Sequence, residues 1–180
     1  EFLHVGTIDS NKQQLGMLQV AEELHRQGVR FRINFAGEQN PSEYCQEFIR
    51  RVRSAEEKGF AKYLGLLKTD ELIHVLDSVH ALVHTPQSEA FGLVIAEALA
   101  RNLKVFAFRT GGIPDIAQAI EHSVLCEPGD WTGLERQMNE WVADGSIGKP
   151  TAQLMRDRYH PESIARRHLE IYREVLNQRA

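Results

Sequence analysis

Cysteine is scarce in this sequence: the chain has two, Cys45 and Cys126, far apart and outside any Cys-x-x-Cys pair. So few cysteines disfavour a disulfide framework and a cysteine-built zinc site, and they favour a reducing compartment. Long apolar runs are also missing, since none approaches the ~20 residues that a membrane span needs, and no signal peptide opens the chain. We therefore expect a soluble, cytoplasmic protein.

An excess of basic charge is missing as well. Lysine and arginine number 21 against 25 for aspartate and glutamate, which gives a net charge of −4. Proteins that wrap nucleic acid usually show a basic stripe or tail, so we expect no nucleic-acid partner. The 180 residues are 42% hydrophobic, which is enough apolar content for one sizeable globular domain.

Several familiar site motifs do not occur in the sequence. No Gly-x-Gly-x-x-Gly follows the first apolar stretch, which disfavours a standard dinucleotide site. The P-loop pattern and the Gly-x-Ser-x-Gly nucleophile elbow are absent, which excludes those two enzyme classes. No Asp-x-Asp pair or His/Cys cluster offers a metal site, so we expect none. The eight histidines are scattered, and each is expected to be a packed or surface residue rather than a catalyst.

Short apolar stretches alternate with longer amphipathic ones, which is typical of βα units over a parallel sheet. The expected strands are residues 2–5, 31–36, 61–64, 81–84, 105–108 and 123–126. The expected helices are residues 14–27, 42–58, 69–76, 92–101, 114–120, 131–143 and 161–178. This alternation predicts an α/β fold: a Rossmann-like, doubly wound parallel sheet of about six strands with helices on both faces.

Three helix ends carry local signals. Gly28 follows the first helix, where a residue in the left-handed conformation is expected. Ser42 is placed to cap the second helix, and Pro161 suits the first position of the last one.

The chain divides at one linker-like stretch, residues 145–150. We expect residues 1–145 to form the Rossmann-like domain, and residues 146–180 to form a C-terminal helical segment that packs on the same domain. The chain enters a strand-like stretch at Phe2 with no loose residues before it, which predicts a domain cut from a longer protein.

Ligands of such sheets bind beyond the carboxyl ends of the strands, and residues 85–100 lead from one of those ends into a helix. From Ala90 to Ala100 every residue is apolar or glycine except Glu97. We therefore expect a helix buried nearly all round, in which an unpaired carboxylate would cost several kcal/mol. Glu97 must then have a partner: either a basic side chain or backbone donors, or the two hydroxyls of a vicinal diol on a ligand.

Glu89 lies in the loop before that helix and is open to two interpretations. It can be a helix-start acid that accepts from free backbone N–H groups, or a polar side chain that points into the ligand crevice. Gly92 lets a ligand approach the backbone closely, and the N–H groups around Leu93 and Val94 can hold a phosphate.

Glu89 and Glu97 fit an E-x7-E pattern within SEAFGLVIAEALA, and further landmarks follow in order over almost the whole chain. These are VGTIDSNK (5–12), FAGE (35–38), YLGLL (63–67) and TGGIPD (110–115). They resemble, in turn, a first strand with its phosphate-binding loop, the end of the second strand, the loop that holds the base, and the segment after the fifth strand. The ordered set resembles the C-terminal, donor-binding domain of the GT-B-fold retaining glycosyltransferases of family 4, also called group 1.

The resemblance implies a division of labour. The domain binds the nucleotide-sugar donor (a UDP-, GDP- or ADP-sugar), and an N-terminal domain outside this chain binds a glycan, lipid or other acceptor. A hexosyl group is transferred between them with retention of configuration, and no metal or other cofactor is required. The isolated domain is then expected to be inactive. The full-length protein could also make peripheral contact with the inner face of the membrane.

The resemblance also assigns roles by position. Glu97 would accept from the ribose hydroxyls, Glu89 would lie near the donor sugar, and the amides of Gly92, Leu93 and Val94 would contact the diphosphate. Lys12 matches the lysine that stabilises the diphosphate leaving group, so Lys12 and Glu89 are the expected catalytic residues. The remaining expected donor contacts are Gly6, Thr7, Gly37, Leu64, Leu66 and Phe91.

The local sequence bears on Lys12 in its own right. It stands just before Gln14 at a helix N-terminus, where a bare cation is unfavourable, so a bound anion would explain it. A solvated surface lysine is the other interpretation. Thr7 stands where the family often has an arginine, so neutralisation of the diphosphate depends more heavily on Lys12. The other departures are Ala90 for glycine, Asp115 for glutamate and Arg101-Asn102 for a small-residue turn.

Two other functions stay open at this point. A non-catalytic nucleotide-binding module would keep the sheet without the chemistry, and Thr7 favours it. Half of a nucleotide-sugar epimerase would share the architecture, although the Phe-Gly-Leu between the two glutamates favours the transferase. The sequence does not identify the nucleotide, the sugar, the acceptor or the oligomeric state.

Overall fold

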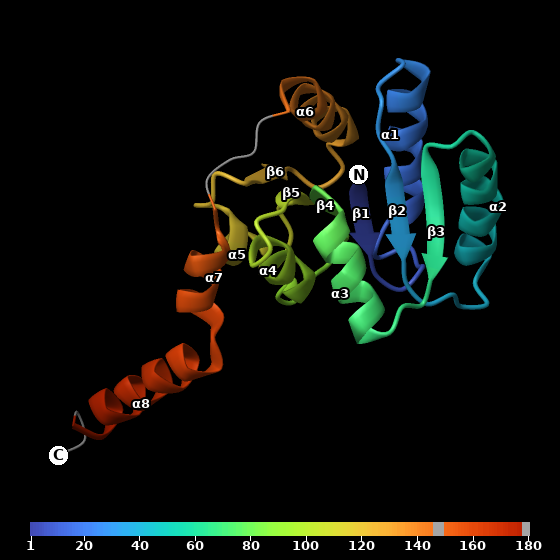
Figure 1. Cartoon of the computed structure of the whole chain (residues 1–180). Helices are drawn as coiled ribbons and strands as arrows, with labels where there is room; N and C mark the ends of the chain where they lie inside the picture. Colours follow the sequence, from blue (N-terminus) through green and yellow to red (C-terminus); the bar gives the residue numbers. More distant parts are fainter. Residues whose placement is uncertain (146–149, 178–180) are drawn as a thin grey trace.

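The computed structural model describes residues 1–145 and 150–177, and a six-stranded parallel sheet forms its centre (Figure 1). The strands are β1 (Phe2–Val5), β2 (Ile33–Ala36), β3 (Ala61–Gly65), β4 (Ala81–His84), β5 (Lys104–Phe108) and β6 (Ser123–Cys126). They lie in the order β3-β2-β1-β4-β5-β6. The chain thus runs outward from β1 to β3, crosses back to place β4 beside β1, and runs outward again to β6. This order confirms the predicted doubly wound sheet and places its reversal between β1 and β4.

Helices cover both faces of the sheet, because successive strand side chains point to opposite sides. The helices are α1 (Gln14–Arg26), α2 (Glu43–Glu57), α3 (Thr69–Ser78), α4 (Leu93–Leu99), α5 (Ile113–Ala117), α6 (Trp131–Asp144), α7 (Ala152–Tyr159) and α8 (Pro161–Asn177). Phe2 and Phe35 share one apolar core with buried residues of α1, α2 and α6. Leu3 and Leu82 share the other core with buried residues of α3, α4, α5 and α7.

The local signals for three helix ends are confirmed. Ser42 Oγ accepts a hydrogen bond from the Cys45 N–H at 3.2 Å and caps α2. Gly28 follows α1 with a φ of 78°, and α8 begins at Pro161. These ends could be predicted because a cap depends on only a few neighbouring residues.

Other boundaries differ from the expected ones. Strand β2 begins at Ile33 rather than at residue 31, and α5 begins one residue earlier and ends three residues sooner. Helix α4 begins at Leu93, because Gly92 takes a left-handed conformation with a φ of 90° and cannot be its first helical residue. The last helix is described as far as Asn177, so the expected end at residue 178 lies outside the described residues.

The C-terminal segment contains a helix, α7, that was not predicted as a separate element. It packs on α4: Met155 is buried, and Thr151 Oγ1 donates to the Leu99 carbonyl at 2.5 Å. By contrast, none of the residues of α8 is buried, and this helix projects away from the sheet (Figure 1). Most of the expected linker, residues 146–149, lies outside the described residues.

The carboxyl ends of β1, β2 and β3 meet through glycines. The Gly6 N–H donates to the Ala36 carbonyl at 2.9 Å, and the Gly37 N–H donates to the Gly65 carbonyl at 2.9 Å. A Cβ atom on Gly37 would lie 1.8 Å from the carbonyl oxygen of Gly6. The backbones therefore approach too closely for any side chain at Gly37, which explains the glycine in the FAGE motif.

We therefore expect Gly37→Ala to lower the free energy of unfolding by about 3 kcal/mol, because the added methyl group meets backbone that has no rotamer to change. Gly28→Ala is the matched control: its φ is 78°, but no atom lies within 4 Å of the added Cβ. It should cost about 1 kcal/mol, the price of the left-handed backbone alone. Urea denaturation of both variants measures this, and equal losses would contradict the close approach.

Candidate functional site

The candidate site lies where the loops after β1 and β4 meet. These loops span residues 6–13 and 85–92, and the two strands that lead into them are neighbours in the sheet. Open α/β sheets bind ligands beyond the carboxyl ends of their strands, at this reversal point. Both expected catalytic residues, Lys12 and Glu89, come from these loops.

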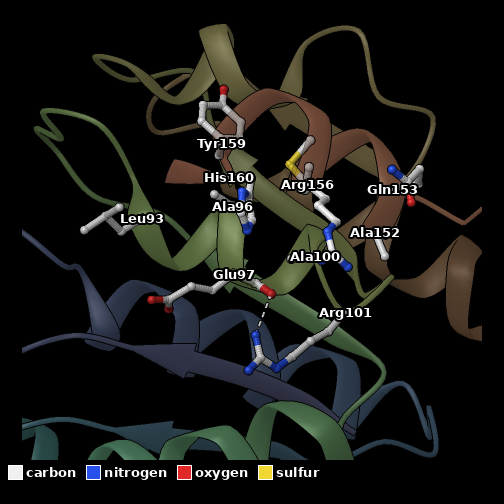
Figure 2. A pocket seen from close by; sticks show the side chains of 11 residues that line it. Leu93, Ala96, Glu97, Ala100, Arg101, Ala152, Gln153, Arg156, Tyr159 and His160 are labelled. Atoms are coloured by element: carbon white, nitrogen blue, oxygen red, sulfur yellow. Dashed lines mark hydrogen bonds between the residues drawn. The ribbon is translucent and has the colours of Figure 1, made fainter. Parts of the chain in front are cut away.

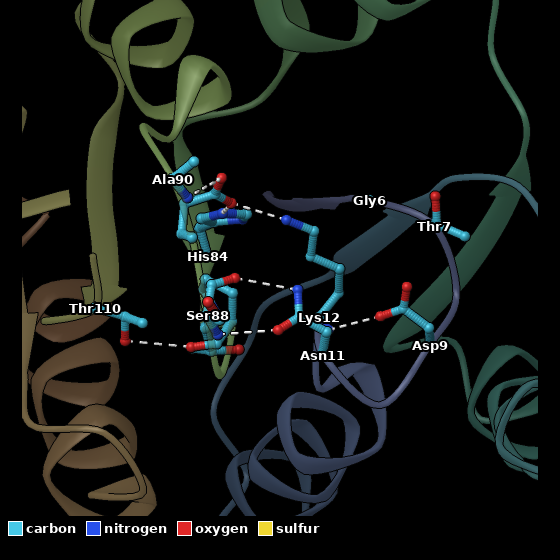
Figure 3. A network of polar contacts seen from close by, with 12 residues as sticks. Gly6, Thr7, Asp9, Asn11, Lys12, His84, Ser88, Ala90 and Thr110 are labelled. Atoms are coloured by element: carbon cyan, nitrogen blue, oxygen red, sulfur yellow. Dashed lines mark hydrogen bonds and ion pairs between the residues drawn. The ribbon is translucent and has the colours of Figure 1, made fainter. Parts of the chain in front are cut away.

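Hydrogen bonds tie the two loops together (Figure 3). The Asn11 carboxamide makes two of them: Nδ2 donates to the Ser88 carbonyl at 3.1 Å, and the Ser88 N–H donates to Oδ1 at 2.9 Å. The Gln87 N–H donates to the Asn11 carbonyl at 2.7 Å, and Gln13 Nε2 donates to the Thr85 carbonyl at 2.9 Å. The relative position of the loops is thus set by groups on either side of Lys12.

A buried glutamine gives the first loop its shape. Gln14 is fully buried at the start of α1, where its Nε2 donates to the Thr7 carbonyl at 2.8 Å and its Oε1 accepts from the Asp9 N–H at 3.3 Å. Asp9 Oδ1 in turn accepts from the Lys12 N–H at 2.8 Å. The Lys12 side chain lies against Gly6, where a Cβ atom would be 2.9 Å from Lys12 Cγ. The loop therefore directs the Lys12 ammonium toward the loop after β4.

Lys12 and Glu89 form an ion pair across the two loops. Lys12 Nζ lies 2.8 Å from Glu89 Oε2, and the two side chains are 21% and 16% exposed. The anion that we expected beside Lys12 is therefore supplied, in this structure, by the chain itself. Glu89 Oε2 also lies 2.9 Å from His84 Nε2, and Glu89 Oε1 accepts from the Ala90 N–H at 3.2 Å.

These contacts keep Glu89 ionised. Partial burial raises the pKa of the Glu89 carboxyl, but the hydrogen bonds from Lys12 and His84 outweigh burial and lower the pKa from 4.5 to about 2. Because this pKa is lower in the folded chain, the contacts stabilise the fold fully above pH 4.5. That contribution is lost as the pH falls toward 2.

The loop after β5 supports Glu89 from the other side. The Gly112 N–H donates to the Glu89 carbonyl at 3.4 Å, and Thr110 Oγ1 donates to the Pro86 carbonyl at 3.3 Å. A Cβ atom on Gly111 would lie 1.6 Å from the carbonyl oxygen of Glu89. Gly111 of the TGGIPD motif is therefore required by backbone contact with the residue that pairs with Lys12.

Our expectation for the helix that carries Glu97 was wrong. Helix α4 is not buried all round: Ile95, Ala98 and Leu99 face the core, whereas Leu93 and Glu97 lie on an exposed face. Within residues 1–145 and 150–177 the Glu97 side chain has no hydrogen-bond or ion-pair partner, and its carbonyl accepts from Arg101 Nη1 at 3.1 Å. Because the carboxylate is solvated, it needs no partner in the chain.

Glu97 lines a groove of about 540 Å³ between α4 and α7 (Figure 2). Its carboxylate extends along α4 on the same side as Leu93, away from the side chain of Arg101 (Figure 2). The groove walls come from both helices, with Ala96 and Ala100 on one side and Arg156 and Tyr159 on the other. The structure thus brings Lys12 and Glu89 into contact and leaves the side chain of Glu97 exposed.

The other expected contact residues lie at the same edge of the sheet with differing exposure. Thr7 is exposed in the first loop, and Leu66 after β3 is 69% exposed, whereas Leu64 is half-buried. Phe91 is 39% exposed and meets Tyr159 edge to face, with ring centroids 5.7 Å apart. Gly92, Leu93 and Val94 open α4, where helix geometry leaves N–H groups without intrahelical acceptors.

Sequence reasoning missed His84. It ends β4, its side chain is 2% exposed, and it contacts the expected catalytic carboxylate. The available signal was its position at the end of an expected strand, five residues before Glu89. Taken one at a time, the scattered histidines gave no reason to connect His84 with Glu89. Over the described ranges, no group of three or more His, Cys, Asp and Glu side chains could hold a metal ion. Among the described helices, none has the length and apolar character that crossing a membrane requires.

Comparison with known proteins connects this geometry to a family. The family model for glycosyl transferases group 1 matches residues 1–158. The chain is 28% identical over 138 residues to the N-acetyl-alpha-D-glucosaminyl L-malate synthase of Bacillus anthracis, which covers 74% of this chain and 35% of that protein. The chain therefore spans about a third of the length of this curated relative.

Two solved structures share the fold. Anabaena HepE in complex with UDP superposes with a TM-score of 0.82 at 19% identity, over 96% of this chain and 48% of that one. The C-terminal domain of the group 1 family protein LpcC from Francisella tularensis superposes with a TM-score of 0.73 at 20% identity, over 87% of this chain and 82% of that one. With a family model that matches most of its length and a sheet that superposes on these domains, the chain belongs to the group 1 glycosyltransferases of the GT-B fold.

Proposed function

We propose that this chain is the donor-binding half of a retaining glycosyltransferase and binds a nucleotide sugar beyond the carboxyl ends of the strands, at the loops after β1 and β4. The observation that carries the proposal is the Lys12–Glu89 pair, which stands at the point where the strand order reverses. Family membership supports it, because group 1 comprises glycosyltransferases. The structural neighbour HepE was crystallised in complex with UDP.

Lys12 suits the diphosphate of such a donor. An ammonium group has three N–H donors, and within the described residues Lys12 Nζ donates to Glu89 alone. The remaining donors can bind phosphate oxygens, together with the N–H groups that open α4. When the bond from the anomeric carbon to the diphosphate breaks, negative charge grows on the leaving nucleoside diphosphate, and a fixed cation stabilises that charge most in the transition state.

Glu97 suits the ribose of the donor. Its side chain is exposed, so both carboxylate oxygens can accept from the two hydroxyls of a vicinal diol. Leu64 near the end of β3 and Leu66 just after it offer apolar surface for the base. Glu89, already held by Lys12 and His84, would then accept from a hydroxyl of the donor sugar.

The acceptor belongs, in this proposal, to a separate N-terminal domain. The length of the relatives supports this. The match with this chain covers about half of HepE and about a third of the N-acetyl-alpha-D-glucosaminyl L-malate synthase. A glycan, a lipid or another hydroxyl compound would bind there, and the whole protein could sit at the inner face of the membrane. Donor binding as proposed uses protein groups alone and requires no metal or other cofactor.

Glu97→Ala should weaken binding of the tightest of UDP, GDP and ADP by about tenfold, the value of one hydrogen bond to a charged group. The loss should be smaller for the 2′-deoxynucleotide, because that ligand lacks one of the two hydroxyls. Calorimetry with both ligands measures this, and Glu57→Ala, an exposed glutamate at the end of α2, is the control. Equal losses for both nucleotides would count against a ribose contact.

Lys12→Ala should weaken nucleoside diphosphate binding by about tenfold or more, because a charge-assisted contact with phosphate is lost. Lys58→Ala, at the exposed C-terminal end of α2, should bind like the wild type. Thermal unfolding of the same samples separates lost binding from lost structure. Weak diphosphate binding that Lys12→Ala does not change would favour the non-catalytic nucleotide-binding module instead.

The 180-residue chain alone should transfer no sugar, because the acceptor half of the cleft is not part of it. Labelled UDP-glucose, GDP-mannose and ADP-glucose, each incubated with a panel of glycan and lipid acceptors, should yield no labelled product. Calorimetry on the same sample shows whether donor binds. A labelled acceptor product formed by this chain would refute the division of labour.

A further inference from the structure

The His84 side chain is buried and contacts the carboxylate of Glu89, one of the two expected catalytic residues. His84 ends β4, its side chain is 2% exposed, and its Nε2 lies 2.9 Å from Glu89 Oε2 (Figure 3). It is thus the second group, after Lys12, that holds the same oxygen of Glu89. Polar side chains are seldom buried this deeply without a defined hydrogen-bonding role.

The contact fixes which ring nitrogen carries the hydrogen. Glu89 is ionised and can only accept, so Nε2 of His84 must donate and Nδ1 holds the lone pair. Within the described residues, Nδ1 has no hydrogen-bond partner. Adding a proton there would place a second cation beside Lys12 in a buried position, and burial together with Lys12 lowers the pKa of His84, although Glu89 opposes this. The titratable groups around His84 are Glu89, Lys12 and His4, whose ring centroid lies 6.4 Å away.

Two donors from different elements therefore orient the carboxylate. Lys12 reaches Oε2 from the loop after β1, and His84 reaches the same oxygen from the end of β4. Oε1 accepts only from the Ala90 N–H, at 3.2 Å, within the described chain. Since each carboxylate oxygen can accept two hydrogen bonds, Oε2 is filled and Oε1 keeps one acceptor position.

We propose that His84 is a positioning residue: its neutral imidazole, with the hydrogen on Nε2, holds Glu89 Oε2 so that Oε1 is presented to a hydroxyl of the donor sugar. The inference rests on the proposed function for its ligand, while the tautomer and the hold on Glu89 are properties of the free chain. Lys12 has a flexible stem and can follow a phosphate, whereas the strand-borne imidazole cannot move with it. His84 therefore keeps Glu89 in place when Lys12 turns to the diphosphate.

The test begins with the free 180-residue chain. Long-range ¹H–¹⁵N correlation spectra should show the Nε2–H tautomer for His84, and a ¹³C titration should place the Glu89 carboxyl midpoint well below 4.5. In His84→Leu that midpoint should rise, and in His84→Gln, which keeps an N–H donor at similar reach, it should stay low. A cationic or Nδ1–H imidazole, or an unchanged midpoint in His84→Leu, would overturn the proposal whether or not the chain binds nucleotides.

Binding supplies the second arm. The probes are UDP-glucose, GDP-mannose and ADP-glucose, each compared with its free nucleoside diphosphate. His84→Leu should lose about tenfold in affinity for the best-bound nucleotide sugar and less than twofold for the diphosphate, with His84→Gln close to wild type. His122→Leu is the matched control, since His122 is 3% exposed and lies before β6. It should change neither affinity.

The outcomes separate the two claims. A wild-type chain that binds no nucleotide refutes the proposed function, and the spectra still decide the hold of His84 on Glu89. A wild-type chain that binds nucleotide sugar, with a His84→Leu variant that binds it equally well, overturns the positioning role. An equal loss for sugar nucleotide and diphosphate overturns it too, because that pattern indicates general damage to the site.

Discussion

A single charge pair, Lys12 with Glu89, joins the two loops on which the site depends. Each side chain is at most about a fifth exposed, so water screens the attraction less than it would on the surface. The pair is net neutral, and Thr7 supplies no second cation where the family often has arginine. A diphosphate at this place would therefore share Lys12 with Glu89 and depend for the rest on backbone N–H groups.

Close backbone contacts, rather than side-chain packing, set the geometry around this pair. Gly37 leaves no space for a Cβ atom beside the Gly6 carbonyl, and Gly111 leaves none beside the Glu89 carbonyl. Main-chain contact thus holds the loop after β1 against the loop after β2, and the loop after β4 against the loop after β5. Such contacts cannot relax by a change of rotamer, so they hold in place the backbone of the loops that carry Lys12 and Glu89.

The two glutamates of the E-x7-E pattern differ in environment. Glu89 is held by a cation, an imidazole and a backbone N–H, which fixes its charge and direction. Glu97 lies on the exposed face of α4, beside the groove between α4 and α7. The held carboxylate of Glu89 suits a group whose orientation toward the ligand must be fixed. The exposed carboxylate of Glu97 suits a group that a ligand reaches from solvent.

The sequence by itself determined the order along the chain of the strands and of every helix but α7, the cap at Ser42, the helix start at Pro161, and the family motifs. Periodicity and capping depend on near neighbours, which is why these features could be predicted. It also placed Lys12 and Glu89 at strand ends. Only the tertiary structure decided what each one meets: that Lys12 pairs with Glu89, that His84 holds the same oxygen, and that Glu97 faces water. Those contacts join residues from different βα units, and an apolar run such as 90–100 does not show which face of its helix the core will cover. Burial is a property of the packed sheet, and no local pattern encodes it alone.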